Sequence, residues 1–176
     1  MSDLDLGAGP PPSAPGDGAG PGADPELVAR AQEVFSTAAL ASFRLNGQFL
    51  AIAEELSRPV GLTAARWQVL GAVLQEALTV AGIARAMGIT RQSVQRIADL
   101  LVDQGLAEYL PNPAHRRAKL LRATDAGLAA VRRINPQHAA VSVRMAEVMG
   151  LPALTAAAEA LTALTKALDT LADPPP

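Results

Sequence analysis

The chain of 176 residues contains no cysteine, and aromatic residues make up only 3% of it. Without cysteine there can be no disulfide bond, thiolate metal site or thiol-based redox switch within the chain. The scarcity of aromatic residues, together with the abundance of Ala and Leu, favours a mainly helical protein whose helices pack through small contacts. This composition fits an intracellular location best, so we expect a cytoplasmic protein.

The sequence also lacks any uninterrupted apolar run near the roughly 20 residues that a membrane-spanning helix needs. No basic segment followed by an apolar one stands at the N-terminus, so we expect a soluble protein with no membrane partner. His115 and His138 are the only histidines, and two histidines without cysteine predict no metal site and no cofactor. No nucleophile elbow, zinc motif or phosphate loop occurs in its proper context, so we expect no enzymatic activity.

The first part of the chain predicts an arm followed by a long helix. Residues 1–23 are mostly Gly, Pro, Ala, Ser and Asp, which predicts a disordered arm. Asp24 and Pro25 can begin a helix that runs to about Ser57 and forms a segment over 24–58. Its apolar seam alternates steps of four and three residues, which is typical of a dimerisation helix. The seam consists of Ala31, Phe35, Ala38, Ser42, Leu45, Phe49, Ile52 and Leu56.

The segment from Thr79 to Gly127 predicts a helix, a tight turn, a second helix and a short hairpin, which is the outline of a winged helix-turn-helix. Thr79 can cap a first helix that ends at Gly88. Thr90 can cap a second helix from Arg91 to about Gln104. The second helix has apolar residues on one face and polar residues on the other. The apolar face can therefore pack against the rest of the domain, while the polar face is free to contact a binding partner. The polar face carries Arg91, Gln92, Gln95, Arg96 and Asp99.

A basic hairpin is predicted directly after this second helix. Strands are expected over residues 106–110 and 118–123, joined by a loop with two prolines that must project because proline cannot join a central ladder. A short hairpin has little reason to be so basic unless it meets an anion, and an arginine at its tip could enter a minor groove. It has three or four basic groups: Arg116, Arg117, Lys119 and, as the fourth, Arg122.

The charge of the chain is unevenly distributed. Residues 79–133 carry nine Lys and Arg against four Asp and Glu, a net charge of +5, whereas the rest carries −7 and the whole chain −2. The basic residues coincide with the second helix and the hairpin. A basic face on an otherwise acidic protein is the electrostatic pattern of a binder of double-stranded DNA.

The C-terminal part, residues 128–172, predicts further helices. Thr124 can cap a helix in which Pro136 should cause a kink or a restart at Asn135. A break at residues 150–152 should precede a last helix with leucines at heptad-compatible spacing. The first and last helices carry more apolar surface than a small winged domain over 59–127 can cover, so we expect a homodimer with interlocked ends. The alternative is that these helices close over one another within a monomer.

These motifs together resemble the MarR family of winged helix-turn-helix regulators. The resemblance is most specific between about residues 60 and 127. It rests on Leu62-Thr63 with Trp67-Gln68-Val69-Leu70, the helix from Thr79 to Gly88, Gly88-Ile89-Thr90-Arg91-Gln92-Ser93-Val94, Leu101 to Gly105-Leu106, and Asn112 through Leu120 to Gly127.

The resemblance implies an obligate dimer, usually a repressor, that binds a pseudo-palindromic site and whose DNA affinity responds to a small phenolic or lipophilic ligand. It implies that the wing arginine, Arg117, enters the minor groove. The family's wing usually has Asp two residues before that arginine, and this chain has His115 there. The residues expected to meet DNA are Thr90, Arg91, Gln92, Ser93, Gln95, Arg96, His115, Arg116, Arg117 and Lys119.

The resemblance also implies that the ligand pocket lies between the dimerisation and DNA-binding parts. Its candidate lining residues are Arg44, Trp67, His138 and Met145, chosen for their position and chemical type. Trp67, the sole tryptophan, is expected first as a core anchor and alternatively as a pocket residue.

The competing function is a winged-helix module that binds a protein instead of DNA. Binding to DNA that weakens steeply with salt would separate the two.

Overall fold

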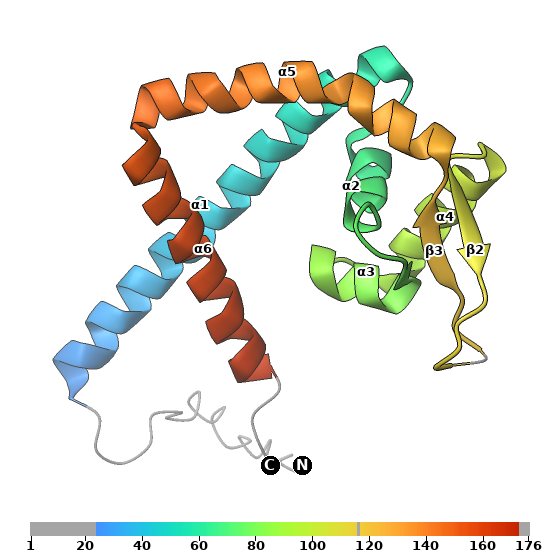
Figure 1. The fold of residues 1–176 in the computed structure, drawn as a ribbon. Coiled ribbons are helices and arrows are strands. Elements are labelled where there is room, and N and C mark those ends of the chain that lie inside the picture. Colours follow the sequence, from blue (N-terminus) through green and yellow to red (C-terminus); the bar gives the residue numbers. More distant parts are fainter. Residues whose placement is uncertain (1–23, 116, 173–176) are drawn as a thin grey trace, which may run out of the picture. The chain divides into compact units, whose positions relative to one another are not determined.

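The computed structural model describes residues 24–115 and 117–172 (Figure 1). It confirms the predicted fold class, which is mainly α with a small antiparallel sheet. The predicted N-terminal arm over 1–23 and the wing residue Arg116 lie outside the described residues. The elements in chain order are α1 (Pro25–Ser57), η1 (Arg58–Val60), α2 (Ala64–Ala72), β1 (Leu78–Thr79), α3 (Val80–Met87), α4 (Arg91–Asp103), β2 (Ala107–Leu110), β3 (Leu120–Ala123), α5 (Asp125–Met149) and α6 (Leu151–Ala172).

The chain divides into two compact units, Met1–Asn46 and Gly47–Pro176, so the boundary falls within α1. The described part of the first unit is a single stretch of helix. Its large apolar side chains are exposed, among them Leu27, Phe35, Leu40 and Phe43. The second unit holds the other helices and the sheet.

Four threonines define where α2, α3, α4 and α5 begin. Thr63, Thr79, Thr90 and Thr124 each take an extended backbone conformation, and each hydroxyl oxygen accepts a hydrogen bond from the backbone N–H three residues later. These bonds satisfy N–H groups that have no partner inside the helix. The caps at Thr79, Thr90 and Thr124 were predicted from the sequence, and all three are confirmed.

The core of the second unit surrounds one face of α4. Val94, Ala98 and Leu101 of this helix are completely buried. They belong to one apolar cluster with Leu70 of α2 and Ile83 of α3. Since the buried residues of α4 lie three or four positions apart, the opposite face of the helix stays at the surface.

The sheet has three strands in the order β1-β3-β2, and both pairings are antiparallel. β2 and β3 form the predicted hairpin, in which Tyr109 lies opposite Leu121. β1 was not predicted. It consists of two residues, with Leu78 opposite Leu121, and it ties the start of α3 to the wing.

α5 is one continuous helix through Pro136 (Figure 1), so of the expected kink or restart at Asn135 the restart is wrong. Proline removes the N–H that would bond the carbonyl of Arg132. Both residues are exposed, so water can bond that carbonyl instead. The predicted break at Gly150 is confirmed, because Gly150 has a φ of +78° and separates α5 from α6.

Within the described residues, no single helix has both the length and the apolarity needed to cross a membrane, and α5 and α6 meet that criterion only as a pair bent by 103°.

Gly127 lets the first turn of α5 approach the turn between α4 and β2. A methyl group on Gly127 would overlap the backbone carbonyl oxygen of Leu106 and would also crowd Leu70. We therefore expect Gly127→Ala to lower the free energy of unfolding by about 1 to 3 kcal/mol, as overpacking does. Urea denaturation followed by circular dichroism measures this change.

Gly71→Ala is the matched control, since a methyl group there meets nothing within 4 Å. It replaces glycine inside a helix and should raise the free energy of unfolding by up to about 1 kcal/mol. Equal effects of the two substitutions would show that the close approach at Gly127 does not exist.

Candidate nucleic-acid interface

The outer face of α4 carries the side chains that the sequence placed on a reading helix. Arg91, Gln92, Gln95 and Arg96 are all exposed. They project from the side opposite the buried residues Val94, Ala98 and Leu101. This face therefore presents two guanidinium groups and two amides on a helix of 13 residues, the element that a major groove admits.

Thr90 and Ser93 contribute first to the start of α4. The Thr90 hydroxyl accepts from the backbone N–H of Ser93 at 3.2 Å. The two hydroxyl groups are also 2.8 Å apart and share a hydrogen bond. Their role in the helix cap is thus defined, and any contact with DNA would be additional.

The tip of the wing is held by local hydrogen bonds, one to a side chain and one within the backbone. The Asn112 side-chain oxygen accepts from the N–H of Ala114 at 3.0 Å, and the N–H of Ala118 donates to the carbonyl of His115 at 3.1 Å. His115, Arg117 and Lys119 are exposed. Arg117 and Lys119 stand in the loop before β3, which begins at Leu120 and not at residue 118 as predicted.

Arg122 differs from the other basic residues of the wing. Its guanidinium donates to the Glu108 carboxylate on β2 at 2.7 Å and 3.1 Å. Both side chains are about half exposed, so this ion pair adds little stability. It does neutralise the charge of Arg122, which leaves Arg117 and Lys119 as cations of the wing for an anionic partner.

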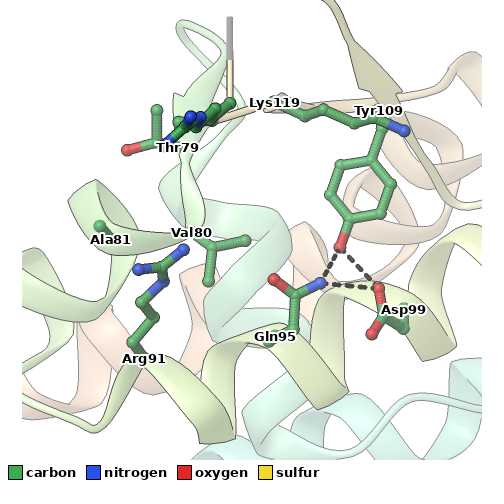
Figure 2. Close-up of a pocket in the computed structure, with 10 residues that line it drawn as sticks. Thr79, Val80, Ala81, Arg91, Gln95, Asp99, Tyr109 and Lys119 are labelled. Atoms are coloured by element: carbon green, nitrogen blue, oxygen red, sulfur yellow. Dashed lines mark hydrogen bonds between the residues drawn. The ribbon is translucent and has the colours of Figure 1, made fainter. Parts of the chain in front are cut away.

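A hollow of about 450 Å³ lies where α3, α4 and the wing meet. Its lining includes Arg91 from α4, Arg117 and Lys119 from the wing, and Thr79 at the start of α3. Figure 2 shows Arg91 and Lys119 on different sides of this hollow. Cations from two separate elements therefore surround one concave surface, and the N-terminus of α3 adds a partial positive charge.

Gln95, Asp99 and Tyr109 form a closed hydrogen-bonded network beside the hollow (Figure 2). The Tyr109 hydroxyl donates to the Asp99 carboxylate at 2.7 Å. The Gln95 amide nitrogen donates to the same carboxylate oxygen at 2.9 Å and to the Tyr109 hydroxyl at 2.8 Å. The Lys119 amine lies 5.8 Å from the centre of the Tyr109 ring, within the range of a cation–π contact. This network joins the outer face of α4 to strand β2 of the wing.

Burial and then the neighbouring Asp99 raise the pKa of Tyr109 from its ordinary 10.0 to about 12. Both effects disfavour the phenolate, because it would lose solvent and face a carboxylate. The hydroxyl is therefore protonated and acts as a donor throughout the physiological range.

A second cavity, of about 500 Å³, is lined mainly by apolar side chains from the end of α1, α2, α5 and the start of α6. Trp67, His138 and Met145 all line it, so the structure brings three of the four candidate ligand residues together. The Trp67 and His138 rings meet edge to face with centroids 5.8 Å apart. Arg44 is not among the lining residues. Trp67 also packs against the core, as expected for a core anchor.

Comparison with known proteins identifies the family. A model described as MarR family matches residues 60–118, the segment from η1 to the wing. An uncharacterized protein of Mycobacterium tuberculosis is 38% identical over 143 residues, which cover 81% of this chain and 94% of that protein. The chain belongs to the MarR family.

Solved structures of MarR regulators share the fold. A MarR family transcription regulator is 24% identical with a TM-score of 0.65, and the match covers 85% of this chain and 99% of that one. The M. tuberculosis regulator MOSR, crystallised with DNA, is 21% identical with a TM-score of 0.63, and the match covers 76% of this chain and 97% of that one. CouR from Rhodococcus jostii RHA1, bound to p-coumaroyl-CoA, is 25% identical with a TM-score of 0.57, and the match covers 75% of this chain and 89% of that one.

Tyr109 is the residue of this MarR protein that sequence reasoning missed. It was predicted only as a residue of the first strand of the hairpin. Tyr109 is 14 residues from Gln95, and only the packing of the hairpin on α4 brings the two together. Tyr109 is the sole tyrosine of the chain, but that fact does not indicate a contact with Gln95.

The sole tyrosine makes its titration directly observable. We expect the phenolate absorbance of the folded protein to appear with a midpoint well above 10 and towards 12. Because the unfolded chain loses this proton first, the free energy of unfolding should fall as the pH rises from 10 towards 12. Asp99→Ala should lower the midpoint only partly, since burial is the larger cause. A midpoint of 10 in the folded wild type would contradict the network.

Proposed function

We propose that this protein is a sequence-specific, DNA-binding regulator of transcription that acts as a homodimer. The observation that carries the proposal is the meeting of exposed cations from α4 and from the wing around one hollow. Two elements that approach one duplex from adjacent grooves need their positive charges on a shared surface. The MarR family membership and the DNA complex of MOSR, a protein of the same fold, support this function.

In this proposal α4 enters the major groove and the wing reaches the adjacent minor groove. Arg91 and Arg96 can each bond guanine O6 and N7 with two parallel donors, and such a pair gives about 1 to 3 kcal/mol of discrimination between bases. Gln92 offers an amide to the same groove. Arg117 contributes mainly affinity, because the narrow minor groove attracts a guanidinium through its negative potential. Lys119 lies on the hollow with Arg117 and fits a phosphate.

The dimer is proposed from the apolar surface of the terminal helices. Phe43 of α1 is 73% exposed and Leu171 of α6 is 76% exposed, and other large apolar side chains of both helices are exposed as well. Large apolar side chains exposed along a helix in this way mark a contact with another molecule. We assign α1 and the C-terminal helices, residues 24–58 and 128–172, to dimerisation and residues 59–127 to DNA binding.

Two copies related by a two-fold axis would present their α4 helices to a pseudo-palindromic operator. The half-sites of such an operator lie about 34 to 36 Å apart, or one turn of DNA. Binding over a promoter would exclude polymerase, so we propose repression as the mode of regulation.

We further propose that a small phenolic or lipophilic effector occupies the cavity beside Trp67. About 500 Å³ suits a small molecule, and the lining is mainly apolar with a few polar groups, as ligand sites usually are. CouR, which shares the fold, binds p-coumaroyl-CoA. An effector alters DNA affinity only if it binds the DNA-competent and incompetent forms of the dimer unequally.

The DNA-binding proposal is tested with alanine substitutions and an operator recovered from bound genomic fragments. Arg91→Ala or Arg96→Ala should weaken binding to the operator about tenfold or more and affect random duplexes less, since base contacts give the discrimination. Arg117→Ala should weaken both. Mobility-shift titrations over a range of salt concentrations measure these effects.

The matched control is Arg132→Ala, which removes an exposed cation from α5 outside the proposed interface. It should leave operator affinity unchanged. Wild-type affinity for all of the first three variants would discard the site assignment. An affinity that does not fall as the salt concentration rises would instead favour a protein-interaction module.

The effector proposal is tested through the fluorescence of the sole tryptophan, Trp67. We expect p-coumarate or its CoA thioester to quench this fluorescence with saturation and to shift the affinity for the operator. Gly71→Phe should abolish quenching and preserve DNA binding, because Gly71 lines the cavity and a side chain there projects into open space. Gly47→Phe, also at a glycine with open space and outside the lining residues, is the control. Unchanged quenching in Gly71→Phe would place any bound ligand elsewhere.

A further inference from the structure

Both amide hydrogens of Gln95 are already used within the protein. One is donated to the Asp99 carboxylate at 2.9 Å and the other to the Tyr109 hydroxyl at 2.8 Å. A glutamine that reads adenine in the usual way needs one of these hydrogens for N7 while its oxygen accepts from N6. Gln95 can make that two-point contact only by leaving the network.

The chemistry of Asp99 and Tyr109 determines which way the Gln95 amide points. An ionised carboxylate can only accept, so the amide atom that faces Asp99 must be the NH₂ group. The Tyr109 hydroxyl donates its single proton to Asp99 at 2.7 Å and therefore accepts from Gln95. In Figure 2 the Gln95 oxygen points away from Asp99 and Tyr109, on the side of Arg91.

The network is also stable against the ordinary changes of pH. Burial and Asp99 hold the pKa of Tyr109 at about 12, so its hydroxyl remains a donor. Gln95 and Asp99 are four residues apart on one helix, a spacing at which side chains meet without distortion. The bond to Tyr109, which lies on a different element, is a second hydrogen bond of the same amide and limits its rotation.

We propose that Asp99 and Tyr109 are specificity-determining residues that hold Gln95 so that α4 presents a lone hydrogen-bond acceptor to the DNA. A lone acceptor selects a base with an exocyclic amino group in the major groove, which is N6 of adenine or N4 of cytosine. Guanine O6 and thymine O4 are acceptors and would face the Gln95 oxygen unfavourably. This inference rests on the proposed function, because it assumes that α4 lies in the major groove.

The expected operator therefore has one position per half-site at which adenine and cytosine bind about equally. Guanine or thymine there should weaken binding about fivefold, the loss of one net hydrogen bond. Replacing adenine at this position by 7-deazaadenine removes N7 and should leave the affinity of the wild type unchanged. Purine without its 6-amino group should weaken binding by the same factor as guanine or thymine.

The test compares base preferences selected from randomised duplexes by the full-length wild type and by variants. Asp99→Ala combined with Tyr109→Phe frees the Gln95 amide, which can then contact adenine N6 and N7 together. This double variant should prefer adenine over cytosine by about fivefold and become sensitive to 7-deazaadenine. Gln95→Ala should lose all preference at the position.

Asp103→Ala is the matched control, since it removes an acidic charge one turn further along α4 and has no bond to Gln95 among the described contacts. Both acidic substitutions should raise affinity for every duplex by reducing repulsion of phosphates, whereas only the network variant should change base preference. Base preference is a ratio between duplexes, so a uniform change in affinity does not affect it.

The outcomes separate this inference from the function on which it rests. A wild type that selects adenine alone and is weakened by 7-deazaadenine would overturn the inference while leaving DNA binding intact. The same holds if the double variant keeps the preference of the wild type. Absence of salt-dependent binding to any duplex by the wild type would instead overturn the proposed function.

Discussion

The burial of one face of α4 is the constraint on which the rest of this structure depends. Val94, Ala98 and Leu101 are completely buried in one apolar cluster with Leu70 and Ile83. This packing fixes the rotation of the helix about its axis, so the arginine and amide side chains on the opposite face lie at the surface. The wing is held against the same helix through the bonds of Tyr109 to Asp99 and Gln95. The orientation of each exposed cation thus follows from apolar contacts behind it.

Most of the winged domain could be predicted from local signals. Each threonine cap, the turn at Gly88 and the apolar spacing of α4 act over three or four residues, so the sequence carries them directly. Features that need a distant partner were missed. β1 is two residues long and exists because Leu121 lies opposite it, and the Tyr109 network requires the hairpin to pack on α4. Pro136 was expected to interrupt α5, but solvent exposure of the affected carbonyl allows the helix to continue. Three ligand candidates share a cavity because their helices converge, and Arg44 does not line it.

Two kinds of surface coexist in this chain and serve different proposed contacts. The basic face of α4 and the wing is polar and suits the exchange of counterions with phosphate. The exposed leucines and phenylalanines of α1 and α6 are suited to burial against a second copy. The cavity beside Trp67 is lined by residues of α1, α2, α5 and α6. A ligand there would contact both the proposed dimerisation helices and the helix that supports α4.

The central claim is that two copies of this chain hold a pair of α4 helices against one duplex. The most direct measurement is the mass of the protein and of its complex with an operator duplex, by sedimentation or light scattering at low and high salt. We expect two chains of 18.1 kDa each in the free protein, two chains per duplex at low salt, and release of the duplex as salt rises. A monomer that leaves the duplex free at low ionic strength would contradict it.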